Sequence, residues 1–323
     1  GRARHAYLLR WDRIFAPRAL NRFLEAGLDA RITHEPFSVM QDGKKIWFDR
    51  GTVIIPVNSR DTPNSESKSE LVHQLVAQAV AEDFVHIVAT HSGLTPDGPD
   101  LGGGSTGILH LPKIAIAAGS GTNSGEAGAA WHAISERFEL NVSLVEASRL
   151  ASGDLSRYNT IVLPGGNYAE GVTNALKAWT RSGGTLVVLA GAVSWANSNG
   201  LISIESKSVD TDSLAKELPY NLLDEARDAQ RIAGSIFEMN LDTTHPVGYG
   251  LSSKLPVFYT SSTLYEYEGE TGGMVGTLSE SPLMSGYISK QKLAQLPGSV
   301  GVIAVRSGRG HVIAFTSNVN HRA

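Results

Sequence analysis

The sequence predicts an α/β protein in which a small α/β domain precedes a doubly wound, mostly parallel sheet. Two observations lead to this prediction. In the second part of the chain, strand-like and helix-like segments alternate, and this order is typical of a parallel sheet with helices on both faces. Predicted strands such as residues 185–190, TLVVLA, are continuously apolar, as strands buried on both faces are.

A glycine-rich stretch marks the expected domain boundary. Residues 92–107, SGLTPDGPDLGGGSTG, carry six glycines and two prolines, which is typical of a linker or long loop. We therefore expect domains at 1–110 and 111–323. The GxSxG match at 103–107 lies inside this stretch. A nucleophile elbow requires a strand before it and a helix after it, and neither is predicted here, so a linker is the better interpretation.

The composition excludes several functions. The chain has 323 residues and no cysteine, so it cannot form a disulfide, a thiolate zinc site, an iron–sulfur cluster or a cysteine nucleophile. The net charge of −4 argues against general nucleic-acid binding, which requires a basic field. The most apolar stretch, 184–196, is shorter than the roughly 20 residues that span a membrane. We expect no nucleic-acid or membrane partner.

The first domain contains two predicted helices and several short strands. Residues 16–27 place apolar side chains at helical spacing and end on a glycine, which favours a helix. Residues 30–39 and 45–57 predict strands. A second, amphipathic helix is expected at 70–83, with a stripe formed by Leu71, Leu75, Val76, Ala79 and Val80.

The second domain begins with alternating elements. Apolar runs predict strands at 113–118, 142–146, 160–164 and 185–190, and helical patterns predict helices at 126–138, at 171–181 and up to about residue 199. The remainder differs. We expect a charged helix at 211–232, strands at 235–241 and 257–261, and a hairpin in which 300–305 pair with 311–315.

One glycine-rich turn follows the first predicted strand of the second domain. Gly119, Gly121 and Gly125 resemble the spaced glycines of a dinucleotide-binding fingerprint with one extra residue, and Glu146 ends the next strand, where a ribose-binding acid would lie. These four residues are candidates for cofactor binding. The alternative is an ordinary βα turn, because many doubly wound folds carry glycines there without binding a nucleotide.

The histidines do not predict a metal site. His132 and Glu136 lie four residues apart on one predicted helix, but the zinc signature HExxH is absent. His86 and His91 have no third ligand nearby in the sequence. We therefore expect no metal or other cofactor to be held by a motif of this chain, apart from the glycine-rich turn.

Residues 183–202 show the layout of a nucleophile elbow: a strand, a sharp turn of small residues, a helix and then Gly-Leu-Ile. Together with Leu-Pro-Gly-Gly at 163–166, this layout resembles the class I glutamine amidotransferase-like superfamily, which has a flavodoxin-like fold. The resemblance implies an elbow at Ala190 and Gly191, oxyanion donors at Gly165 and Gly166, and an acid at Glu126. The nucleophilic cysteine is missing, and Ser194 lies four residues too late to replace it.

A longer series of segments resembles the C-terminal region of secreted bacterial zinc carboxypeptidases of the carboxypeptidase A type. The matching pieces occur in a fixed order at 11–27, 48–57, 92–102, 126–138, 154–166, 245–251 and 308–322. The resemblance implies an upstream peptidase domain as intramolecular partner, zinc only in that domain, and a secreted or periplasmic location. The peptidase domain itself is absent from these 323 residues.

Three functions stay open from the sequence. The first is a non-catalytic accessory, regulatory or binding region of a zinc carboxypeptidase, with a peptide or glycan as possible ligand. The second is a non-covalent hydrolase in which Glu126 or His321 acts as general base on water and the 165–166 amides stabilise the oxyanion. The third is a nucleotide-binding module that uses residues 119–125.

Overall fold

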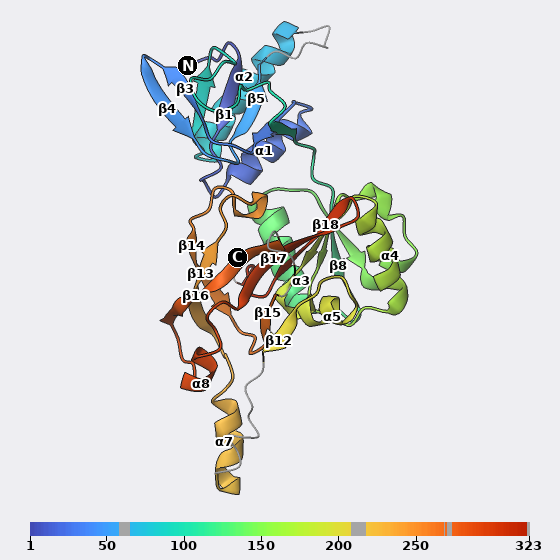
Figure 1. Ribbon diagram of the computed structural model, residues 1–323. Helices are drawn as coiled ribbons and strands as arrows, with labels where there is room; N and C mark the ends of the chain where they lie inside the picture. The colour runs from blue at the N-terminus through green and yellow to red at the C-terminus, as the bar shows by residue number, and fades with distance from the viewer. Residues whose placement is uncertain (58–64, 208–217, 268, 270–272, 322–323) are drawn as a thin grey trace. The chain divides into compact units, whose positions relative to one another are not determined.

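The computed structural model describes residues 1–57, 65–207, 218–267, 269 and 273–321, and the chain forms two compact units (Figure 1). The predicted boundary near residue 110 lies beside the change of unit between Pro112 and Lys113. Two later segments also belong to the first unit, which no local sequence pattern predicts. The first unit is Gly1–Pro112 with Phe138–Leu140 and Thr243–Ser252, and the second is Lys113–Arg137, Asn141–Asp242 and Ser253–Ala323.

The first unit is built on a five-stranded antiparallel sheet of order β6-β1-β5-β2-β7, beside a separate β3–β4 hairpin. The two strands predicted at 30–39 and 45–57 are each wrong in extent, because Pro36 and the left-handed Gly51 (φ 84°) break them. The expected linker at 92–107 is also corrected, since its end pairs as β7. The strands are β1 (Ala6–Leu9), β2 (Arg31–Thr33), β3 (Phe37–Gln41), β4 (Lys44–Phe48), β5 (Val53–Pro56), β6 (Ile87–Thr90) and β7 (Thr106–Ile108).

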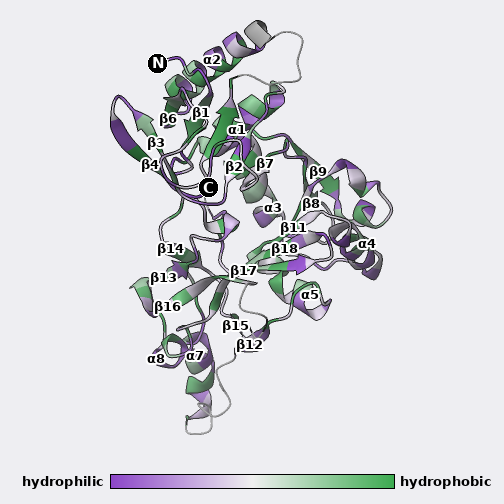
Figure 2. Ribbon diagram, turned by 45° about the horizontal axis from the view of Figure 1, so that its top comes forward, coloured by the Kyte–Doolittle hydropathy of each residue, from purple (hydrophilic) through white to green (hydrophobic). Residues whose placement is uncertain are grey.

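Helices cover one face of this sheet, and the β3–β4 hairpin covers the other. Side chains alternate along β1, so that Leu9 packs with helices α1 (Ala16–Glu25) and α2 (Ser65–Glu82), while Leu8 packs against Phe37 and Phe48 of the β3–β4 hairpin. The apolar strands lie between these layers in Figure 2. The predicted helix 16–27 is confirmed as α1.

The stripe predicted on the second helix is partly wrong. Val76 and Ala79 are buried as expected, but Val72 is the residue that joins them in the core. Leu71 and Val80 are exposed. Each helical residue turns about 100° from the last, so an assignment shifted by one residue moves the ends of a stripe out of the core.

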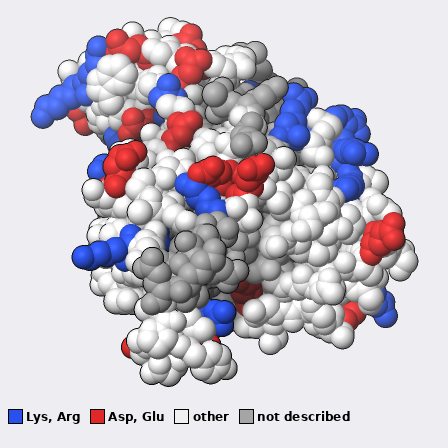
Figure 3. Space-filling view, turned by 60° about the horizontal axis from the view of Figure 1, so that its bottom comes forward, with Lys and Arg blue, Asp and Glu red and all other residues white. Residues whose placement is uncertain are grey.

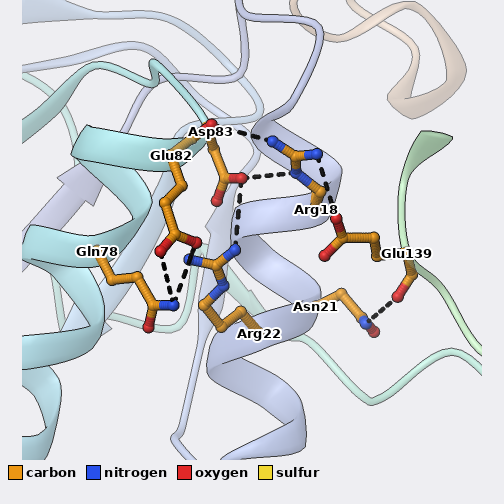
Figure 4. Close-up of polar contacts among 7 residues, drawn as sticks. All are labelled: Arg18, Asn21, Arg22, Gln78, Glu82, Asp83 and Glu139. Atoms are coloured by element: carbon orange, nitrogen blue, oxygen red, sulfur yellow. Dashed lines mark hydrogen bonds and ion pairs between the residues drawn. The ribbon is translucent and has the colours of Figure 1, made fainter.

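A buried carboxylate joins the two helices of the first unit (Figure 4). The Asp83 side chain, at the end of α2, is fully buried, and Arg18 Nε on α1 donates to its Oδ1 over 2.6 Å. Arg22 Nη2 lies 3.5 Å from the same oxygen, and Arg22 Nη1 lies 2.8 Å from Glu82 Oε2 without the angle of a hydrogen bond. Two cations therefore compensate one desolvated anion.

The second unit contains a nine-stranded mixed sheet of order β14-β13-β16-β17-β18-β11-β10-β8-β9. A short β12–β15 pair lies apart from it. The expected hairpin near the end of the sequence is confirmed as β17 and β18. The strands are β8 (Ile114–Ala118), β9 (Val142–Glu146), β10 (Thr160–Leu163), β11 (Thr185–Val188), β12 (Glu205–Lys207), β13 (Ser235–Leu241), β14 (Lys254–Tyr259), β15 (Leu264–Glu266), β16 (Met274–Ser285), β17 (Val300–Ser307) and β18 (Gly310–Phe315).

The prediction of a mostly parallel sheet holds for only part of it. β18, β11, β10, β8 and β9 are parallel neighbours, whereas β14, β13, β16 and β17 join through antiparallel pairs. Within the parallel part, the order from β9 to β18 reads 2-1-3-4-5 in chain order, as in doubly wound sheets. The order reverses between β8 and β10, which is where such sheets place their ligands.

Helices cover both sides of the parallel strands (Figure 1). α4 (Glu170–Arg181) and α5 (Val193–Ser198) pack in one core with alternate residues of the strands. α3 (Ser124–Trp131) contacts β8. The single helix predicted at 126–138 is wrong in type beyond Trp131, because His132–Arg137 form a π-helix. Of the helix predicted at 211–232, residues 211–217 lie outside the described residues, and the rest holds a 3₁₀ turn (Tyr220–Leu222) followed by α7 (Leu223–Asp228). The helix α8 (Lys290–Leu293) was not predicted.

The surface carries charges of both signs. On the face that Figure 3 draws, Lys and Arg are interspersed with Asp and Glu, and neither sign forms one continuous field. Among the described residues, no helix is both long enough and apolar enough to cross a bilayer.

Candidate functional site

A pocket of about 270 Å³ lies at the carboxyl ends of the parallel strands. Because β8, β10, β11 and β18 run in the same direction, the loops that follow them meet at one edge of the sheet. The segments that follow β8, β11 and β18 contribute the walls of the pocket, which is lined by Gly125, Glu126, Ala129, Leu189, Ala190, Ser317, Asn318, Val319, Asn320 and His321.

The Glu126 carboxylate is the centre of this site. Glu126 lies in the first turn of α3, where Asn123 Oδ1 caps the helix by accepting from the Glu126 amide over 3.0 Å. Glu126 Oε2 accepts from the Gly165 amide over 2.6 Å, and Oε1 accepts from the Gly191 amide over 3.1 Å. One carboxylate thus joins the turns that follow β10 and β11.

Both turns need glycine, because their backbones approach each other closely. A Cβ on Gly191 would lie 2.9 Å from the Glu126 carboxylate oxygens and from the Gly165 Cα. A Cβ on Gly165 would lie 3.0 Å from the Gly191 Cα. Glycine therefore allows the two amides to converge on one acceptor.

The strand-to-helix turn has the predicted elbow shape. β11 ends at Val188, a 3₁₀ turn covers Ala190–Ala192, and α5 starts at Val193. Ala190 lines the pocket at the elbow position. Ser194 lies on α5, where its side chain contacts the phenol of Tyr265, and burial raises the pKa of that phenol. Ser194 is not among the residues that line the pocket.

Tyr168 holds the turn that carries the Gly165 amide. Its hydroxyl donates to the Pro164 carbonyl over 2.6 Å, and its ring packs edge-on against Trp195. Burial, and then the negative charge of Glu126, raise the pKa of Tyr168. The phenol therefore stays neutral and fixes the turn that carries the Gly165 amide.

His321 also lines the pocket. Its ring lies 4.5 Å from that of Phe258, and its backbone amide donates to the Asn318 carbonyl over 3.1 Å. The chain from Ser317 to His321 follows β18, so its place beside Glu126 depends on the parallel pairing of β18 with β11.

The structure therefore brings together several of the predicted site residues. Glu126, His321 and Ala190 line one pocket, and the Gly165 and Gly191 amides donate to Glu126. The amides that converge on Glu126 are those of Gly165 and Gly191; Gly166 forms a bridge with Thr122, and the donor role of its amide stays a prediction. The sequence interpretation missed Ala129, Tyr168 and the 317–320 loop. For that loop, the available signal was its position directly after an apolar strand.

The glycine-rich turn at 119–125 is occupied by side chains of its own unit. Glu146 Oε1 accepts from the Ser120 amide over 3.0 Å, and a Cβ on Gly119 would collide with the same carboxylate. Gly121 packs beside the 165–168 turn, where its carbonyl accepts from the Asn167 amide over 3.0 Å. Gly125 lines the pocket beside Glu126. A phosphate would have to displace a carboxylate from this turn.

Within the part of the chain that the structure describes, no cluster of three or more His, Asp or Glu side chains has an arrangement that could hold a metal ion. His132 and Glu136 lie on the π-helix that follows α3, and His86 lies 3.0 Å from an Arg13 nitrogen.

Comparison with known proteins gives no family. No family model and no curated protein matches the sequence. Three solved structures illustrate the structural likenesses: an exo-β-1,4-mannosidase from Opitutaceae bacterium strain TAV5 (16% identity, TM-score 0.40, 65% of this chain and 32% of that one), a putative GMP synthase subunit from Thermoplasma acidophilum (10%, 0.41, 66% and 87%), and a putative ThuA-like protein from Parabacteroides merdae ATCC 43184 (18%, 0.39, 64% and 78%). The matched part spans about a third of the mannosidase and 29% of a Bacillus circulans β-galactosidase. All these TM-scores are below 0.5, so no activity is taken from these proteins.

Proposed function

We propose that the second unit is a non-catalytic binding module with a degenerate amidotransferase-like site. The observation that carries this proposal is the pair of hydrogen bonds from the Gly165 and Gly191 amides to Glu126. An acyl-transfer site needs backbone donors aimed at the oxygen that becomes negative in the transition state. Here a resident carboxylate already occupies the two converging donors.

The missing nucleophile supports the same proposal. Ala190 stands at the elbow, and the sequence contains no cysteine. An alanine cannot form a covalent intermediate. Since the elbow carries no attacking group and Glu126 already accepts from the two converging amides, the pocket fits binding better than turnover.

The pocket wall indicates the ligand class. Ala129, Leu189 and Val319 give an apolar lining, and Glu126 supplies a carboxylate. Each carboxylate oxygen can accept more than the one amide hydrogen bond it receives, so acceptor capacity is left for a ligand. A small apolar group bearing an N–H or ammonium donor fits this combination, and peptides carry such groups. A glycan offers mainly hydroxyls and fits it less well.

We propose further that this module accompanies a zinc carboxypeptidase domain in the same protein. This part rests on the sequence resemblance of the ordered segments from 11–27 to 308–322. Zinc and peptidase chemistry would then belong to the partner domain, and the location would be secreted or periplasmic.

One alternative has a specific observation in its favour, because Glu126 and His321 line the same pocket. Glu126 would then act as a general base on water. To do so with an oxyanion in the usual place, it would have to release both glycine amides. The nucleotide-binding alternative would require the same of Glu146 at the Ser120 amide.

Two measurements on the whole chain test the proposal. Amidase, peptidase and esterase assays, with and without zinc, should show no turnover. Titration with short peptides that carry an apolar or lysine side chain should shift the backbone amide resonances of Gly165, Gly191 and residues 318–321. Glu126→Gln should weaken this binding, and Glu136→Gln, on the exposed π-helix, should not.

Opposite results would refute the module. Turnover that disappears in Glu126→Gln or His321→Ala would establish the hydrolase instead. A stabilising thermal shift with phosphate or nucleoside phosphates, lost in a Gly119→Ala variant, would favour the nucleotide site, since a ligand at 100 times its Kd adds about 2.7 kcal/mol to stability.

A further inference from the structure

A second pocket, of about 290 Å³, lies within the first unit. Three segments that are far apart in the sequence form its walls: residues 10–12, residues 49–52 and residues 243–251. Each belongs to, or directly adjoins, one of the segments singled out in the sequence. The lining residues are Arg10, Trp11, Asp12, Asp49, Arg50, Thr52, Thr243, Gly250 and Leu251.

Close backbone packing fixes these walls. Gly51 has a φ of 84°, and a Cβ there would lie 2.6 Å from the Tyr249 Cβ. Gly250 has a φ of 73°, and a Cβ there would collide with the Trp11 carbonyl. Both positions therefore require glycine for conformation and for space. The pocket is a formed feature of the unit and not a gap between loose loops.

Short hydrogen bonds hold two further wall residues. Thr52 Oγ1 donates to the Asp49 carbonyl over 2.7 Å, which fixes the turn that presents Asp49 and Arg50. Arg10 Nη2 donates to the Trp47 carbonyl over 2.8 Å, and its guanidinium lies 4.5 Å above the Phe48 ring. The backbone around the charged residues is thus set before any ligand arrives.

The charged side chains of this pocket are not paired with one another. Across the described residues, the Asp12, Asp49 and Arg50 side chains form no ion pair or hydrogen bond, and Arg10 forms no ion pair. The pocket therefore presents two carboxylates and two guanidinium groups that are not paired with one another. Its formal charges cancel, so it offers no net attraction for a simple anion or cation.

We propose that this pocket binds a small zwitterion of the α-amino-acid or dipeptide class. The ligand ammonium group would be held by Asp12 and Asp49, and its carboxylate by Arg50. Charge-assisted hydrogen bonds are the strongest of the polar contacts available, and a guanidinium can bind a carboxylate in a bidentate manner. A zwitterion alone satisfies both signs at once, whereas a neutral sugar would leave every charge without a counter-charge.

The test removes one charge of the ligand at a time. Calorimetric titration of the full chain would use L-alanine and L-alanyl-L-alanine, beside N-acetyl-L-alanine, which lacks the ammonium group, L-alaninamide, which lacks the carboxylate, and D-glucose. We expect the two zwitterions to bind and each singly charged analogue to bind on the order of tenfold more weakly. Amide resonances of residues 10–12, 49–52 and 243–251 should move during the titration.

Variants then assign each charge to a residue. Asp49→Asn should weaken the binding of L-alanine and L-alaninamide but leave that of N-acetyl-L-alanine unchanged. Arg50→Gln should weaken the binding of L-alanine and N-acetyl-L-alanine but leave that of L-alaninamide unchanged. Matched controls are Asp42→Asn and Arg4→Gln, two exposed residues of the same unit outside this pocket. Glu136→Gln, outside both pockets, serves as the control in the second unit. The resonances that move, residues 10–12, 49–52 and 243–251 here but Gly165, Gly191 and 318–321 there, distinguish failure here from failure of the proposed function.

Several results would overturn this assignment. They are no saturable binding of either zwitterion, preferential binding of D-glucose, no resonance shifts in the three wall segments, or folded Asp49→Asn and Arg50→Gln variants that bind L-alanine as the wild type does.

Discussion

At the scale of single residues, the Glu126 side chain accepts the hydrogen bonds that two converging backbone amides could otherwise donate to a ligand. Backbone amides that converge on one point at the end of parallel strands form an anion site. In this protein the anion is a side chain from the first turn of α3. The arrangement is stable without a ligand because no converging donor is left unsatisfied.

Replacing Glu126 by glutamine tests how much this internal anion contributes. The amide group of glutamine offers one acceptor and one donor, so one of the Gly165 and Gly191 amides would face a donor. We expect unfolding of the second unit to become easier by about 1.5–3 kcal/mol, the range of hydrogen bonds to charged groups. Urea unfolding monitored by amide resonances of that unit would measure it.

The control for that prediction is Glu136→Gln. Glu136 is exposed on the π-helix and is not among the pocket residues, so its effect should lie within about 0.5 kcal/mol. Equal stabilities for Glu126→Gln and the wild type would show that the two short contacts contribute nothing net.

The candidate site was accessible from sequence only in pieces. The glycines at 165 and 191 and the acid at 126 were predicted through the family resemblance, since their spacing along the chain does not show that they meet. The pairing of Gly165 with Gly191 was not predicted, because only backbone coordinates reveal which amides of two turns face one acceptor.

At the scale of elements, the buried strands were predicted most reliably. β8, β10 and β11 are continuous apolar runs, and burial on both faces produces that pattern. β16 was missed because its sequence, MVGTLSESPLMS, mixes polar residues and a proline, and its pairings contain irregularities in register. Its place in the sheet comes from long-range pairing, which local patterns do not encode.

The α1–α2 contact gives a prediction at this scale. Asp83 is a buried anion between Arg18 and Arg22 (Figure 4), and removing one member of a buried ion pair leaves uncompensated charge. We expect Asp83→Ala to destabilise the first unit by about 3–5 kcal/mol. Hydrogen exchange in peptides covering residues 16–25 and 65–82 would report the loss as faster exchange.

Glu82→Ala is the matched control, because Glu82 also contacts Arg22 but its side chain is 53% exposed. Exposed ion pairs contribute about 0–1 kcal/mol, so exchange in the same peptides should change little. Similar exchange in the two variants would contradict the view that burial, and not the number of ion pairs, determines the contribution of Asp83.

At the scale of the whole molecule, the sequence order and the spatial units differ. Residues 243–252 lie between β13 and β14 of the second unit in the sequence, yet they belong to the first. The sequence could place a boundary near 110 from its glycines and prolines. It could not show this later return, because no compositional change marks residues 243–252.

Because residues 243–252 belong to the first unit, we can predict how a shortened chain would behave. Tyr249 is buried against Gly51, and its hydroxyl lies 3.2 Å from His34 Nδ1. A chain of residues 1–112 alone would therefore lack a side chain that packs against its own sheet and turns. Burying one large side chain contributes about 1.5–3 kcal/mol. We therefore expect faster hydrogen exchange at residues 31–34 and 51–56 in this fragment than in the full chain.

A matched fragment distinguishes the loss of residues 243–252 from a general loss of stability caused by removing the second unit. In it, residues 243–252 follow residues 1–112 through a Gly/Ser linker long enough to reach their native place, so the missing side chain is restored without the rest of the second unit. Exchange at residues 31–34 and 51–56 should then slow toward that of the full chain. If the two fragments exchange alike, the 243–252 segment does not stabilise the first unit, and the sequence-based division at residue 110 would describe the protein better than the contacts of Tyr249 do.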